Sequence, residues 1–497
     1  MNNIFNKDFL SNLKDHTNPN LIEKIATPLI DYDKYDLLQQ INIASQEGKD
    51  HLMYTQYISK YGENQSSNLL IPLLDHYSKT PFIRDFFIIS NPIDAERLSR
   101  KHIKKASNFK FLLGDSIIST TDNKHWRSQR NDYIESFFPN TLEKLIPISN
   151  KRAKECSSLL WQKSNKGRTK VNINDFLLNE TQAQLQLALF GFNNEFQDKM
   201  NPLIRDDLSG FSNNKALSNN IKKLLKEVKN ADGPLSEIMK ERTDKTKTED
   251  FFNMILFTFA GHDTTGHTLT WLIYELAKNI NLQKKLQDEV DNFWMEQGNK
   301  EITFNDLKKL KFMTRCIMET LRLWPAVTNG TFREIEDDDE ITGLNNKKVT
   351  INKGSLIQII NWTRHRNPIL WGNDVLDFNP DREFKENEIW ENEGLKASNP
   401  SSDRFSPFSY SPRDCLGKTF AQIEMRLILL NLMKNYNFIL TSKQSSAVFN
   451  GDYLGINRAT LYPLDIYAPE HCMNKKFKPY NAGLYVHILK RIKNSKL

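Results

Sequence analysis

Apolar residues along the chain follow a helical spacing over long stretches and a strand-like spacing over short runs. Helical spacing marks residues 51–61 and two segments between Leu142 and Phe190, whereas in the polar segment 191–249 it indicates helices only weakly. Strand-like runs occur at 69–74, 86–90, 349–354 and 356–360, and around Arg333 and Ile341. The pattern therefore predicts a mixed domain of long helices and short strands.

The apolar run from Phe251 to Lys278 predicts a central buried helix. Its middle, residues 259–266, reads Phe-Ala-Gly-His-Asp-Thr-Thr-Gly, although each glycine inside a helix costs about 1 kcal/mol relative to alanine. We therefore expect something large to approach the backbone. Thr264 can bond back to the Ala260 carbonyl and open the helix, and Asp263 adds a carboxylate. The segment is interpreted as a proton-delivery device, with an N-cap-like helix break as the alternative.

Cys415 lies between the loop-like segment Phe408-Ser-Tyr-Ser-Pro-Arg-Asp and a helical pattern that begins at Lys418. The dipole and free N–H groups of a helix N-terminus favour the thiolate, the form that binds metals or attacks electrophiles. From these residues alone, Cys415 is a nucleophile, a metal ligand or an ordinary buried cysteine.

Two further pairs have helical spacing. Trp126 and Arg130 share a helix face and can offer an indole N–H and a guanidinium to one anion, or the arginine simply stacks on the tryptophan. Glu319 and Arg322 are one turn apart in an apolar helix, which predicts a structural ion pair. Arg382 is a candidate third member that braces the loop holding Cys415.

Composition narrows the class of protein. The chain has 497 residues, 39% hydrophobic and 11% aromatic, which indicates a packed globular protein. Its four cysteines are far apart, so disulfides are not expected to organise the fold and a reducing compartment fits. The net charge of +7 is spread out, which favours an acidic partner or anionic lipid over nucleic acid.

No segment has the roughly 20 apolar residues of a spanning helix, so we expect a soluble, cytoplasmic protein with at most peripheral membrane contact. The alternative location is the peroxisome, because the chain ends in Ser495-Lys496-Leu497.

These ordered motifs resemble those of the cytochrome P450 family over residues 50–490. The family's haem-binding loop is matched by Phe408, Arg413, Cys415 and Gly417, and its oxygen-activation helix by Ala260, Gly261, Asp263 and Thr264. Its ExxR helix is matched by Glu319 and Arg322, and the arginine of its downstream loop by Arg382. The residues that match its partners of the haem propionates are Trp126, Arg130, Arg333 and Arg413. The resemblance implies a mainly α fold with small β-sheets in one large haem-binding domain. A polar segment, 1–49, would precede it without a membrane anchor, and a short basic tail, 491–497, would follow it.

The resemblance further implies a non-covalent haem b (iron protoporphyrin IX) with Cys415 as axial thiolate, which favours O–O cleavage. Asp263 and Thr264 would relay protons, and the glycines would leave space for haem and dioxygen. One departure is Ser411, which stands where the family usually has glycine, and glycine there usually serves a turn that a side chain strains.

The implied activity is a haem-thiolate monooxygenase that uses O2 and acts on an apolar fatty acid, sterol or terpenoid. Residues 416–497 are too few for a reductase domain, so electrons would come from a separate NADPH-dependent reductase or ferredoxin. The alternatives are an isomerase or dehydratase acting on peroxides and a haem-binding protein of reduced activity. The expected substrate pocket is apolar, and its candidate residues are Phe109, Phe111, Leu112, Phe259, Ala326 and Val327.

Overall fold

A computed structural model of the chain describes residues 19–75, 82–107, 110–210, 214–242, 247–389, 400–446, 454–457, 460–463 and 483–492. Ser495-Lys496-Leu497 and Phe109 lie outside these residues. No helix in the described ranges is long and apolar enough to span a membrane.

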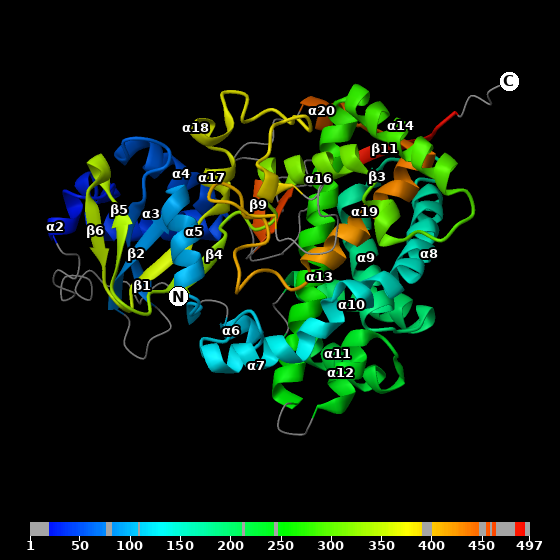
Figure 1. Ribbon diagram of the computed structural model, residues 1–497, viewed down its shortest axis with the longest axis horizontal. Helices are drawn as coiled ribbons and strands as arrows, with labels where there is room; N and C mark the ends of the chain where they lie inside the picture. Colours follow the sequence, from blue (N-terminus) through cyan, green and yellow to red (C-terminus); the bar gives the residue numbers. More distant parts are fainter. Residues whose placement is uncertain are drawn as a thin grey trace.

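Helices make up most of the described chain, and long helices fill one end of the molecule (Figure 1). The helices are α2 (Pro19–Ile22), α3 (Lys34–Gln46), α4 (Asp50–Tyr61), α5 (Pro92–Lys101), α6 (Lys110–Leu113), α7 (Asn123–Ile134), α8 (Pro139–Lys163), α9 (Ile173–Gln184), α10 (Asn194–Gly210), α11 (Asn214–Glu227), α12 (Pro234–Glu241), α13 (Lys247–Lys278), α14 (Ile280–Gln297), α15 (Phe304–Leu307), α16 (Lys311–Leu323), α17 (Asn361–His365), α18 (Pro368–Trp371), α19 (Lys418–Asn435) and α20 (Ser442–Ser446). The weakly indicated segment after residue 191 thus contains three helices, α10 to α12.

Short strands form four small sheets. The strands are β1 (Leu69–Asp75), β2 (Phe82–Ile89), β3 (Val171–Asn172), β4 (Thr331–Glu334), β5 (Asp339–Thr342), β6 (Lys348–Ile351), β7 (Leu356–Ile359), β8 (Tyr436–Leu440), β9 (Leu454–Asn457), β10 (Thr460–Pro463) and β11 (Tyr485–Lys490). The largest sheet has the order β1-β2-β7-β4, in which β2 and β7 are parallel and the other pairs antiparallel. The others are β3-β11-β8, β5-β6 and β10-β9. The expected mainly α fold with small sheets is therefore confirmed.

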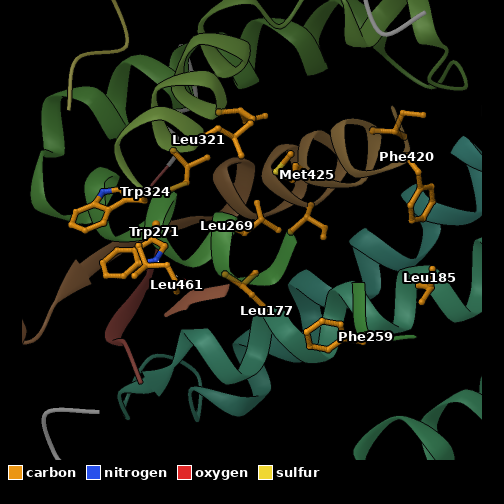
Figure 2. Close-up of a cluster of buried hydrophobic side chains, with 14 of the residues drawn as sticks. Leu177, Leu185, Phe259, Leu269, Trp271, Leu321, Trp324, Phe420, Met425 and Leu461 are labelled. Atoms are coloured by element: carbon orange, nitrogen blue, oxygen red, sulfur yellow. The ribbon is translucent and has the colours of Figure 1, made fainter. Parts of the chain in front are cut away.

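The main hydrophobic core lies where α9, α13, α16 and α19 meet. Figure 2 shows Leu177 of α9, Leu269 of α13, Leu321 of α16 and Met425 of α19 in this cluster. All four side chains are buried, which explains why α13 is apolar on nearly every face. The core thus fixes α13 against α9 and α19, the elements that carry most of the predicted site.

The described part of the segment before residue 50 is packed onto the main body. Leu37 and Ile41 of α3 belong to the same hydrophobic cluster as the central helices. At the other end, Arg491 forms an ion pair with Asp291 at 2.6 Å. Described residues on both sides of the expected domain, 50–490, therefore contact its main body.

Candidate functional site

The loop that carries Cys415 is closed by a backbone hydrogen bond, in which the Cys415 N–H donates to the Phe408 carbonyl at 2.9 Å. Helix α19 begins directly after it at Lys418, with Gly417 as its N-cap. Phe408 packs against the main core. Loop and helix together hold Cys415 at the start of α19, where the sequence placed it.

The strain expected at Ser411 lies elsewhere in this loop. Ser411 does not adopt a positive φ, and its side chain is exposed. The residue in the left-handed region is Ser409, with φ 62°. The expectation that a side chain at position 411 strains the turn is therefore wrong, because the conformation that favours glycine falls two residues earlier.

The Cys415 thiol differs from the other described cysteines. Cys156 and Cys316 are completely buried, whereas Cys415 keeps accessible surface. Burial by the surrounding protein nevertheless raises the pKa of the Cys415 thiol, and the Lys418 ammonium and the Gly417 N–H lower it less. The expected preference for thiolate at the helix N-terminus is thus outweighed by burial. Coordination to a metal, which deprotonates a thiol outright, would supply the missing stabilisation.

Two buried arginines and one half-buried lysine lie near this loop. Arg333 on β4 and Arg413 have pKa values lowered to about 9, mainly by burial and, for Arg413, also by the neighbouring Arg333 charge. Burial and both guanidinium groups lower the pKa of Lys105 well below its usual value. Within the described part of the chain, the Nε and Nη2 atoms of Arg333 and the Nε atom of Arg413 have no hydrogen-bond partner. Like charges that are shielded from water repel one another and need partners for their unused donors. An anion with more than one acceptor oxygen would stabilise this cluster.

Trp126 and Arg130 on α7 lie beside the loop that holds Cys415. The Arg130 guanidinium donates to the Asp414 carboxylate at 2.8 Å and to the Asp414 carbonyl at 3.0 Å. Its guanidinium carbon also lies 6.0 Å from the centre of the Trp126 ring, and that of Arg413 lies closer, at 4.2 Å. Arg130 therefore braces the residue next to Cys415, and Trp126 contacts both guanidinium groups.

Glu319, Arg322 and Arg382 form the expected buried ion-pair triad. Arg322 donates to both oxygens of Glu319 at 2.7 and 2.8 Å, and Arg382 donates to Glu319 Oε1 at 3.1 Å. Arg322 also donates to the His365 carbonyl at 2.9 Å, and His365 Nε2 accepts the Ser406 N–H at 3.0 Å. The triad is thus connected through one residue to the loop that holds Cys415.

Helix α13 runs without interruption through the predicted proton-delivery segment. The Thr264 hydroxyl donates to the Ala260 carbonyl at 3.0 Å, as predicted. Ala260, Gly261 and Thr264 are half-buried and lie on one face, because residues four apart overlap along a helix. The helix is therefore neither broken nor capped at this segment.

The glycines of α13 make room for another helix. A Cβ at Gly261 would lie 2.9 Å from the Leu185 side chain, and one at Gly266 would lie 2.7 Å from the Leu178 side chain and 3.0 Å from its Cα. Both partners belong to α9 and the π-helical turn that follows it, Leu185–Leu189. Among the described residues, α9 and the turn after it thus approach this backbone closely at Gly266 and Gly261.

Asp263 is completely buried and does not share the half-buried face of Thr264. Its Oδ2 accepts a hydrogen bond from the Thr460 hydroxyl of β10. Its Oδ1 lies 3.6 Å from Nδ1 of His267, one turn further along α13. The acid and the alcohol are therefore neighbours in sequence on adjacent faces of the helix.

The predicted substrate-pocket residues are only partly described. The side chains of Phe111 and Leu112, like the whole of Phe109, lie outside the description. Phe259 is buried, and Ala326 and Val327 are half-buried after α16. Two surface pockets, of about 330 and 470 Å³, are lined by residues of α8 with α9 and of α8 with α19 and β11. Neither contains a predicted site residue, so the chemistry of the side chains rather than pocket size locates the site.

Sequence reasoning missed Lys105, Arg364, His365 and Thr460. Lys105 forms an isolated β-bridge with Arg333, and Arg364 donates to the Ser406 hydroxyl at 2.7 Å and the Tyr410 hydroxyl at 2.9 Å. These contacts join segments that are far apart in the chain, so the spacing of residues within one segment does not predict them. The run Arg364-His365-Arg366, which stands shortly before Pro368, was the signal that the sequence offered.

Comparisons with known proteins agree with this geometry. The family model described as cytochrome P450 matches residues 192–456. The putative cytochrome P450 CYP13A6 of Caenorhabditis elegans is 36% identical over 219 residues, which cover 44% of this chain and 39% of that protein. The putative cytochrome P450 CYP13A7 of the same organism is 34% identical over 206 residues, or 41% and 36% of the two chains. Cytochrome P450 4F1 of Rattus norvegicus is 26% identical over 388 residues, or 67% and 70%.

A fold of long helices and small sheets, with a cysteine loop beside buried cations, defines a haem-thiolate class of protein. The family model covers more than half of the chain, and the chain belongs to the cytochrome P450 family. The matched segments span well under half the length of the two Caenorhabditis elegans relatives.

Haem b, which members of this family bind through a cysteine thiolate, fits the residues present. Its two propionates would supply anionic acceptors for the unused donors of Arg333 and Arg413. Cys415 offers the one accessible thiol among the described cysteines. Lys105 joins the arginines as a third cation on this side of the site.

Proposed function

We propose that this protein is a monooxygenase that inserts one atom of O2 into an apolar substrate of the fatty acid, sterol or terpenoid class. The observation that carries the proposal is the accessible thiol of Cys415 beside buried guanidinium groups that have unused donors. Haem, when bound, supplies the redox-active iron at which dioxygen is activated. Electrons would come from a separate reductase or ferredoxin.

The chain's own residues would act in three ways. The Cys415 thiolate would push electron density onto its metal and so favour O–O cleavage. Arg333, Arg413 and Lys105 would hold the propionates by charge-assisted hydrogen bonds. Thr264, whose hydroxyl proton is used at the Ala260 carbonyl, would accept a hydrogen bond from a water molecule and hold it on the half-buried face of α13. Protons would reach that water from Asp263.

The first test is the absorption spectrum of the reduced, carbon monoxide-bound protein. Thiolate ligation gives a red-shifted Soret band, and we expect Cys415→Ser to abolish it. An unchanged spectrum in Cys415→Ser would refute this residue as the ligand.

The second test concerns proton delivery. Thr264→Ala should keep the thiolate band but divert electrons from NADPH into peroxide, because the hydroxyl that orders water is lost. Product formation per NADPH is measured with and without the substitution. An equal yield of product per NADPH in the two proteins would rule out the role of Thr264.

A separate assay tests the alternative function. Turnover of a fatty acid hydroperoxide without NADPH would support an isomerase or dehydratase.

A further inference from the structure

Asp263 is held by a residue that lies 197 positions away in the sequence. The Thr460 hydroxyl donates to its Oδ2, and both side chains are completely buried. A hydroxyl that donates to a buried carboxylate satisfies one of its oxygens and fixes its rotamer. The orientation of Asp263 is therefore tied to strand β10.

Strand β10 is itself firmly attached to its surroundings. The Leu461 carbonyl accepts the indole N–H of Trp271 at 3.1 Å, and the Leu461 N–H donates to the Ala326 carbonyl at 3.0 Å. Figure 2 shows Trp271, Trp324 and Leu461 packed together, and the two indole rings stack at 4.1 Å. The Thr460 hydroxyl is thus positioned by contacts to α13 on one side and to Ala326, a predicted pocket residue, on the other.

The second group at Asp263 is a neutral imidazole. Burial lowers the pKa of His267 to about 3, so its ring is uncharged at neutral pH and its 3.6 Å approach to Asp263 Oδ1 is not an ion pair. The Thr460 hydroxyl therefore donates to Oδ2 of Asp263, while the uncharged imidazole lies near Oδ1.

We propose that Thr460 is a positioning residue for Asp263, so that the β9–β10 hairpin controls the geometry with which the carboxylate delivers protons. This inference rests on the proposed function, in which Asp263 supplies the protons that Thr264 relays. It also links a wall of the predicted pocket to proton delivery, because Asp263 and Ala326 are hydrogen-bonded to adjacent residues of β10, Thr460 and Leu461.

The test compares Thr460→Val, which removes the hydroxyl at nearly constant volume, with Thr460→Ser, which keeps it. The loss of one hydrogen bond to a charged group should lower the ratio of product to peroxide about tenfold in Thr460→Val. Thr460→Ser should restore most of that ratio. The reduced carbon monoxide spectrum is recorded for each variant to show that the haem site is intact.

A measurement that does not depend on activity uses the thermal stability of the haem-loaded protein. The thermal midpoints of Thr460→Val, Asp263→Asn and the double variant form a double-mutant cycle. If the contact is real in solution, Thr460→Val lowers the midpoint in the parent protein and adds little in the Asp263→Asn background. Additive shifts would overturn the proposal.

Asp263→Asn also separates the two hypotheses. If Asp263→Asn lowers the ratio of product to peroxide but Thr460→Val does not, Thr460 has no positioning role and the proposed function stands. If Asp263→Asn leaves coupling unchanged, the proton-delivery role of Asp263 is wrong, and the positioning proposal fails with it.

Discussion

Two glutamates in the core are buried to the same extent but have opposite surroundings. Glu319 accepts hydrogen bonds from two arginines, whereas neither oxygen of Glu424 on α19 has a hydrogen-bond partner among the residues that the structure describes. Burial, with a smaller contribution from the nearby Glu180 carboxylate, raises the pKa of Glu424 well above its ordinary value. Glu424 is therefore protonated in the folded protein at pH values where it is ionised in the unfolded chain.

This difference predicts how stability depends on pH. Because the folded state binds the extra proton, the contribution of Glu424 to stability falls as pH rises above about 4.5, its ordinary value, towards the raised pKa. Glu424→Gln, which is neutral at every pH, should lose less stability between pH 5 and pH 8 than the parent protein. Thermal midpoints at pH 5, 6.5 and 8 measure the change. Exposed Glu296 provides the control as Glu296→Gln, and equal pH profiles for parent protein and Glu424→Gln would contradict the prediction.

At the scale of single residues, sequence reasoning succeeded where partners are close in the chain. Glu319 and Arg322 are one turn apart, so their pairing follows from helical periodicity alone. Lys105 and Thr460 have partners on remote strands, and only the folded topology brings them to Arg333 and Asp263. The conformation of Ser409 was missed for a related reason, since a positive φ at serine has no signature in the sequence.

Among the elements, the contact between α13 and α9 shapes the site most strongly. Gly261 and Gly266 let the two helices approach, and the Thr181 hydroxyl of α9 donates to the His262 carbonyl at 2.9 Å. The π-helical turn Leu185–Leu189 then begins opposite Gly261. The position of the half-buried face of α13 thus depends on how closely α9 packs behind it.

Gly266→Ala should destabilise the protein more than Gly261→Ala. Both substitutions gain about 1 kcal/mol of helix propensity. The new methyl at position 266 meets the backbone of Leu178, which cannot rotate away, and overpacking of this kind costs about 1–3 kcal/mol. The methyl at position 261 meets only the end of the Leu185 side chain. Urea unfolding followed by circular dichroism gives the order, and a more stable Gly266→Ala variant would contradict this packing.

The existence of these helices could be predicted from apolar spacing, but the partner of the glycines could not. Small residues in an apolar helix indicate that another group packs closely against the helix, but they do not show which group it is. The family resemblance predicts that haem lies near these glycines. The described neighbours of a methyl group at position 261 or 266 are Leu185 and Leu178, in and just after α9. The segment 194–241 was weakly indicated because its helices are rich in Asn and Lys, which dilute the apolar period.

On the whole molecule, the surface near the cysteine loop carries exposed cations. Lys124 and Arg127 lie on α7, the helix that is tied to the loop by the Arg130–Asp414 ion pair at 2.8 Å. We expect an acidic electron donor to dock there, because complementary charge mainly raises association rates. This follows the proposed function, in which electrons come from another protein.

Lys124→Glu with Arg127→Glu should therefore slow reduction by a ferredoxin or an NADPH-dependent reductase and weaken its dependence on salt. The matched control reverses two charges elsewhere, as Lys284→Glu with Lys300→Glu. Stopped-flow reduction at low and high ionic strength gives both rates. Equal slowing in the two double variants would point to net charge rather than to docking on α7.

The order in which the largest sheet assembles has a consequence for folding. Strand β7 lies between β2 and β4, and Phe86 on β2 pairs with Leu356 on β7. Strand β4, which carries Arg333, is joined to β1 and β2 through β7. Contacts between such distant residues form slowly, and until they form one edge of β2 is open to other chains. Arg333 is thus expected to reach its place in the sheet late in folding, and the nascent protein should be most prone to aggregate before β7 joins β2.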